Sequence, residues 1–150
     1  MENVRNIANW FLSQSSMTHK KLQKLCYYAQ AWYCALYDGT PLFADEIQAW
    51  VHGPVINFLY HYFADYRWNE IPKTDFDDST LPDDVIEVLE AVYNTYGGFT
   101  GDQLEVLACS EEPWIVTRGN LKPWETCNKP ISRDVMRSYY AKQYAQSQND

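Results

Sequence analysis

The stretch Glu46-Ile47-Gln48-Ala49-Trp50-Val51-His52-Gly53-Pro54-Val55 combines a short strand pattern, a turn and the start of a helix. Apolar residues alternate with others from position 47 to 51, which is typical of a strand. Gly53 permits backbone angles that other residues avoid, and Pro54 suits the first turn of a following helix. The sequence therefore predicts an exposed corner where Trp50, His52 and a helix N-terminus meet.

Outward from this corner, helical signals predominate. Thr18 is placed as an N-cap, Thr100 and Gln103 form a capping-box pattern, and Ser132 precedes the last apolar run. Three of the runs are followed by a glycine signal, at Asp38-Gly39, Gly97-Gly98 and Gly119, and these signals predict where the helices end. The expected helices cover about residues 2–12, 18–38, 55–65, 82–96, 100–109, 110–119 and 132–145. We expect a mainly α, single-domain bundle of about 6–8 helices with one small β element near residues 46–51.

The domain is expected to span residues 1–150, with a core of about 5–140 and a frayed tail at 146–150. A polar segment from 67 to 81 is interpreted as a surface loop, because neither flanking part of the chain could easily form its own core.

Charge is distributed unevenly along the chain. The formal net charge is −8, and residues 41–112 contain 2 basic and 15 acidic side chains. An acidic middle argues against a broad nucleic-acid surface, because phosphate binding needs clustered Lys and Arg. The same charge suits a basic protein partner.

The four cysteines predict neither a disulfide nor a zinc site. Cys26 and Cys34 lie eight residues apart on one expected helix, about 12 Å along its axis, which is too far for a disulfide. No pair has metal-ligand spacing, and no metal or cofactor is predicted. Reduced thiols, together with the lack of a long apolar segment or a signal-peptide pattern at the start, predict a cytoplasmic protein without a membrane segment.

Four stretches in order resemble one known family. They are Lys21–Trp32, Pro41–Phe43, Glu46–Val55, and Tyr96–Gly101 followed by Ser110–Trp114. Together they resemble the Panacea antitoxin domain, found in SocA-like and phage-associated GepA-type proteins. The resemblance covers about residues 5–140.

The resemblance implies a mainly helical domain that neutralises the toxin of a toxin–antitoxin pair by direct protein contact. The expected partner is therefore a cognate toxin. In the alternative, which some family members follow, the domain is an adaptor that delivers the toxin to an AAA+ protease. The chain shows no evident DNA-binding extension, and a helix-turn-helix formed by the first two helices is disfavoured because the second helix contains no arginine.

His52 has several interpretations: a general base, a ligand, or a hydrogen-bonding clamp of the corner. No motif supplies the nucleophile or carboxylate that catalysis needs, so the structural clamp is favoured and a hydrolytic role is a minor alternative. We predict no enzymatic activity and no catalytic residue.

The helix beginning at Thr18 carries lysines in its first turns, where the helix dipole disfavours cations. They belong either to a contact surface or to a solvated basic face. The aromatic residues that follow wrap around this helix, which indicates burial on several faces or an aromatic stripe for a partner. We hypothesise a partner-binding surface of Lys21, Lys24, Tyr27, Trp50 and His52.

Glycines from 97 to 101 precede a helix and so invite comparison with a phosphate-binding loop. The stretch lacks the GK[ST] ending and a preceding strand, so a helix–helix turn is favoured. Gly97 and Gly98, like Gly53 and Pro54, are therefore assigned structural roles.

Overall fold

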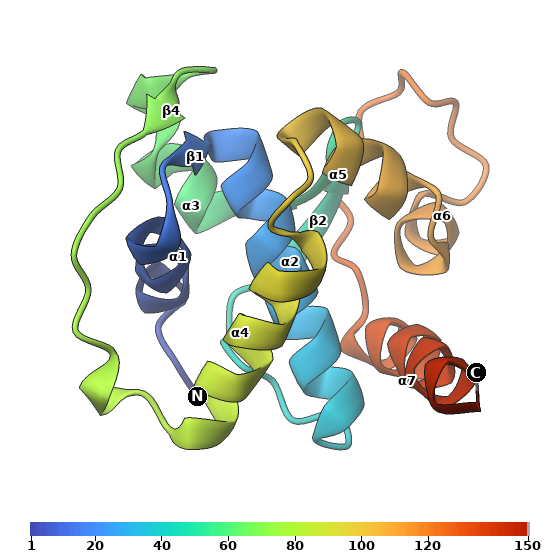
Figure 1. Cartoon of the computed structure of the whole chain (residues 1–150). Coiled ribbons are helices and arrows are strands. Elements are labelled where there is room, and N and C mark those ends of the chain that lie inside the picture. The colour runs from blue at the N-terminus through green and yellow to red at the C-terminus, as the bar shows by residue number, and fades with distance from the viewer. Residues whose placement is uncertain (150) are drawn as a thin grey trace.

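The structure is a computed structural model that describes residues 1–149. Helix α2 (His19–Leu36) is the central element of its fold. It contacts α1, α4, α5, α7 and strand β3, so most of the chain is wrapped around one helix (Figure 1). The other helices are α1 (Val4–Gln14), α3 (Asn57–Tyr62), α4 (Asp83–Tyr96), α5 (Gly101–Cys109), α6 (Glu112–Arg118) and α7 (Arg133–Asn149). The described residues thus contain seven α-helices, and two short 3-10 turns, η1 (Ala64–Tyr66) and η2 (Asp78–Thr80), as the mainly α prediction requires.

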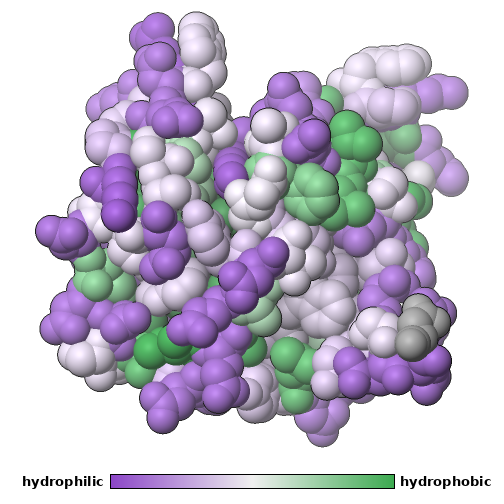
Figure 2. Space-filling view, viewed as in Figure 1, coloured by the Kyte–Doolittle hydropathy of each residue, from purple (hydrophilic) through white to green (hydrophobic). Residues whose placement is uncertain are grey.

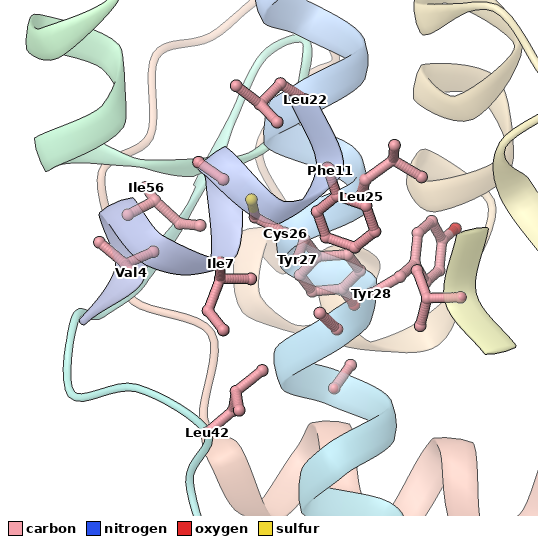
Figure 3. Packing of buried hydrophobic residues seen from close by; sticks show 14 of the residues in the cluster. Val4, Ile7, Phe11, Leu22, Leu25, Cys26, Tyr27, Tyr28, Leu42 and Ile56 are labelled. Atoms are coloured by element: carbon pink, nitrogen blue, oxygen red, sulfur yellow. The ribbon is translucent and has the colours of Figure 1, made fainter. Parts of the chain in front are cut away.

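The predicted burial of α2 on several faces is confirmed. Tyr27 and Tyr28 are fully buried, and Trp32 is half-buried. Figure 3 shows side chains of α1, including Ile7 and Phe11, packed over those of α2. The aromatic residues of this helix therefore serve the core, where each fully buried side chain contributes about 1.5–3 kcal/mol.

Polar side chains of α2 form hydrogen bonds with backbone groups of the segments that surround this helix. Gln23 exchanges hydrogen bonds with the backbone of Ile56, at 2.8 and 3.1 Å. Gln30 accepts from the N–H of Leu42 at 2.7 Å and donates to the carbonyl of Phe43 at 2.7 Å. These bonds satisfy buried backbone groups, so α2 fixes irregular segments as well as apolar ones.

The β structure is more extensive than the one element predicted. Strand β2 (Ile47–Trp50) pairs antiparallel with β3 (Gly53–Ile56), and β1 (Met17–Thr18) pairs with β4 (Glu70–Ile71). The second pair lies partly in the segment interpreted as a loop. Two-residue strands have no periodicity to detect, and this pairing depends on chain segments about fifty residues apart.

The helix expected at 55–65 begins later, at Asn57, because Val55 and Ile56 belong to β3. The prediction that Pro54 lies in a helical first turn is therefore wrong: Pro54 pairs with Ala49 in the hairpin. Within α3, Phe58 and Tyr62 stack on each other at the surface, with ring centroids 5.7 Å apart. Leu59 and Phe63, one residue along, have the same spacing and are the buried pair.

Two helix ends also differ from expectation. The first helix starts at Val4 after an Asn3 N-cap, while Glu2 forms a bridge with Phe43. The last helix continues to Asn149, so the frayed tail expected at 146–150 is helical over its first four residues; Asp150 lies outside the described residues.

Candidate functional site

The corner between β2 and β3 is a two-residue connection, Val51–His52, closed by Gly53. Gly53 has φ +106°, in the region that favours glycine. The N–H of Ala49, opposite Pro54, donates to the carbonyl of Lys129 at 3.0 Å. The backbone N–H and carbonyl of Ala49 therefore point away from β3. Because Ala49 needs no hydrogen bond from the residue opposite it, a proline, which has no N–H, fits at position 54.

The outer edge of β2 is held by Arg118, the last residue of α6, and by residues of the segment that follows α6. Besides the bond from Ala49 to Lys129, the N–H of Ile131 donates to the carbonyl of Ile47 at 2.7 Å. Arg118, which is 3% exposed, donates to the carbonyl of Ala49 at 2.9 Å and lies over the Trp114 ring at 4.9 Å. The corner is therefore supported by a buried guanidinium.

The tip of the corner is tied to α5 through His52. Its side chain is 73% exposed, and its Nδ1 lies 3.2 Å from the Glu105 carboxylate. Glu105 also accepts from Lys20 at 2.6 Å, and Lys20 in turn reaches Asp102 at 2.9 Å. Partial burial disfavours the charged Glu105 carboxylate, but the hydrogen bonds from Lys20 and His52 outweigh this effect and lower its pKa.

Beside the turn, Trp50 is half-buried and donates its Nε1–H to Gln48 at 2.7 Å. Its ring contacts that of Tyr60 on α3, with centroids 4.9 Å apart. The segment 57–68 exposes five large aromatic side chains: Phe58, Tyr60, Tyr62, Tyr66 and Trp68. Trp50 also lines a surface cavity of about 470 Å³, which lies between the corner and residues 126–128.

Beneath the corner lies Lys24, 2% exposed, whose Nζ donates to the carbonyl of Pro54 at 3.3 Å. Burial, together with the nearby charge of Lys20, lowers the pKa of Lys24 to about 8, although Cys109 and Glu105 oppose the shift. The amine fills the space below Gly53, since a Cβ at that glycine would lie 2.8 Å from Lys24 Cε.

A family model described as "Antitoxin SocA-like, Panacea domain" matches residues 22–115, which include the corner, α3 and α5. The chain belongs to this family. No curated protein and no solved structure matches the chain. Within residues 1–149, none of the helices has both the length and the apolar character needed to cross a membrane.

The Panacea domain of this chain brings together only part of the hypothesised partner surface. Trp50 and His52 are neighbours at the corner, and His52 makes a hydrogen bond of the kind expected of a clamp. Lys24 and Tyr27 are buried, so neither side chain is exposed for direct contact with a partner. Lys21 is half-buried and donates to the carbonyl of Gly97 at 2.6 Å, where it caps α4.

The turn glycines differ in importance. Gly97 follows the last residue of α4, as expected, and a Cβ there would collide with the carbonyl oxygen of Tyr93. Gly98 has no atom within 4 Å of such a Cβ, so the structure gives no steric reason for glycine at this position. The predicted capping box of Thr100 and Gln103 is present and starts α5.

No sequence pattern pointed to Glu105 or Arg118, and Lys20, although one of the lysines in the first turns of its helix, was left out of the hypothesised surface. Glu105 is the carboxylate that no motif near His52 supplied, because it comes from α5, 53 residues along the chain. Glu105 links Lys20 to His52 at the tip of the corner, whereas Lys24 lies buried beneath the corner. Lys20 and Lys24 are four residues apart, which predicts that they share one face of the helix, but this spacing does not indicate which of the two is buried.

Replacing Lys24 with methionine is expected to raise the free energy of unfolding by ~1–3 kcal/mol at pH 7. A desolvated cation is exchanged for an apolar chain of similar length, at the loss of one long hydrogen bond. The pKa of Lys24 is lower in the folded than in the unfolded chain, so the wild type gains stability as pH rises from about 8 to about 10.5. The advantage of Lys24→Met should shrink across that window.

Urea unfolding of both proteins at several pH values measures this difference, and the pairwise comparison removes the titration of the tyrosines and cysteines. Lys142→Met, on the exposed part of α7, is the control and should change little. A Lys24→Met gain that is absent at pH 7, or that does not vary with pH, contradicts a desolvated amine.

Proposed function

We propose that this Panacea domain neutralises a protein toxin by binding it directly, without turnover, through the β2–β3 corner. Membership of an antitoxin-like family supports a toxin as the partner. The observation that carries the choice of surface is the corner itself, where exposed His52 and half-buried Trp50 are held by buried residues behind them.

Two features of the corner support its use as a protein interface. Aromatic residues are enriched in interfaces and supply large, rigid contact area. Trp50 connects the corner to Tyr60 and so to the exposed aromatic residues of α3, while the cavity beside it offers a concave site for a partner side chain. The revised binding surface consists of Trp50, His52 and Tyr60.

The proposal requires that a gene adjacent to this one be toxic when expressed alone and harmless when expressed together with this chain. Protection should persist in a strain that lacks AAA+ proteases, and the two proteins should co-purify. Protection that requires the protease would instead support the adaptor alternative.

Trp50→Ala is expected to weaken toxin binding by about 2 kcal/mol, or about 30-fold, because a central aromatic anchor is lost. Tyr144→Ala, an exposed aromatic residue on α7, is the matched control and should bind as the wild type does. Titration calorimetry measures both. Equal affinities for the two variants would remove the corner from the interface.

His52→Ala separates binding from chemistry. In the binding proposal its effect on protection follows its effect on affinity, because His52 acts only by contact. A folded His52→Ala protein that still co-purifies with the toxin but no longer rescues growth would support the hydrolytic alternative and contradict the proposal.

A further inference from the structure

A second, apolar groove lies between α2 and α4, away from the corner. It has a volume of about 160 Å³. Its lining residues are Trp32, Leu36, Val88, Ala91, Val92, Thr95 and Tyr96. In the space-filling view, the surface is hollowed between α4 and α7, with pale and green residues in the hollow (Figure 2).

The floor of the groove is fixed before any partner arrives. Trp32 Nε1–H donates to the Tyr96 hydroxyl at 2.9 Å, and Tyr96 stacks on Tyr28 with centroids 4.0 Å apart. The Tyr28 hydroxyl is in turn bonded to Glu111 at 2.7 Å. A rigid floor loses little conformational entropy on binding.

The rim of the groove admits close approach. Ala91 and Thr95 are small, exposed and one helical turn apart on α4, and Leu36 on the facing helix is 41% exposed. A ridge of side chains from another helix can therefore enter between α2 and α4. Helix α4 has 14 residues, about 21 Å, which matches three to four turns of such a helix.

The chain segment that contains α4 is strongly acidic. Residues 74–117 contain 11 Asp or Glu and no Lys or Arg. On α4 these include Asp83, Asp84, Glu87 and Glu90, and within the described residues no ion pair is formed by any of them. The basic Arg137 of α7 is paired with Asp38 at the end of α2.

We propose that the α2–α4 groove seats a cationic amphipathic helix of a partner protein, with its apolar face on Trp32 and Leu36 and its basic residues beside Glu87. Apolar complementarity supplies the affinity, and the unpaired acids of α4 select a basic helix and speed its association. Binding of such a helix does not depend on the β2–β3 corner.

The probe is a synthetic peptide of about 18 residues, with leucine at helical i, i+3, i+4 and i+7 positions and lysine elsewhere. The matched peptide carries glutamate in place of lysine. The lysine peptide should bind the full chain, should shift the Trp32 indole N–H resonance, and should bind more weakly as salt rises; the glutamate peptide should not bind.

Two groove variants test the location. Ala91→Trp fills the groove and Thr95→Lys places a cation in it, and each should weaken peptide binding at least about tenfold while circular dichroism remains that of the wild type. Asp65→Asn/Glu70→Gln removes two acids elsewhere and should have little effect, and Trp50→Ala should also bind normally. The proposal would be overturned if both groove variants bound the lysine peptide as tightly as the wild type does, or if only Asp65→Asn/Glu70→Gln lost affinity for it. Either result would mean that the peptide adsorbs to general negative charge.

Discussion

Gly53→Val is expected to lower the free energy of unfolding by about 3 kcal/mol. The backbone of Gly53 has φ +106°, which a β-branched residue adopts only under strain. Its added Cβ would also lie 2.8 Å from Cε and 3.3 Å from Nζ of the buried Lys24. The backbone strain and the close contact both result from the same added side chain, so the loss of stability should exceed that of an ordinary turn substitution. Thermal or urea unfolding measures it.

Two comparisons separate the causes. Gly98→Val is the matched control, because Gly98 has negative φ and open space around it, and its stability should change by less than about 0.5 kcal/mol. Gly53→Ala in a Lys24→Ala background should recover the part due to the contact but keep the strain. An unchanged melting temperature for Gly53→Val would show that the corner tolerates a side chain, and that its conformation is not the reason for glycine.

The sequence predicted best those features that depend on neighbouring residues. Thr18, Thr100 and Gln103 act within one helical turn, so their caps could be identified without knowledge of the rest of the fold. The turn at Gly53 belongs to the same class, because its special φ is a local property.

The features that were missed depend on what lies across the fold. Val55 and Ile56 fit a helical spacing, but β3 forms because β2 is already fixed along its outer edge and Gln23 bonds the backbone of Ile56. Lys24 sits in the first turns of a helix, where exposure is usual, yet the corner covers it. Neither fact has a signal within a window of neighbouring residues.

The candidate site shows the same division. Trp50 and His52 could be assigned to an exposed corner from their own stretch of sequence. Which residues stand behind them could not, because Glu105 and Arg118 come from α5 and α6. The corner therefore joins a locally encoded turn to supports supplied from 50 to 70 residues away.

Arg118→Ala is expected to lower the free energy of unfolding by about 3 kcal/mol. The guanidinium donates to the carbonyls of Ala49, Lys122 and Glu125, and it packs on the Trp114 ring. Truncation leaves the buried carbonyl of Ala49 without its donor and removes the packing. Urea unfolding gives the total. The amide of Ala49 donates to the carbonyl of Lys129, in the segment after α6. Hydrogen exchange at this amide therefore reports release of the outer edge of β2.

Two arginine variants make the interpretation specific. Arg137→Ala removes an exposed guanidinium whose partner Asp38 is almost fully exposed, and it should cost less than about 0.5 kcal/mol. Arg118→Lys keeps the charge but cannot reach three carbonyls in one plane, so its stability should fall between wild type and Arg118→Ala. Slow exchange of the Ala49 amide in Arg118→Ala, equal to that in the wild type, would mean that the 119–130 segment holds β2 without the arginine. The corner would then be supported by backbone bonds alone, and Trp50 and His52 would keep their positions when the guanidinium is lost.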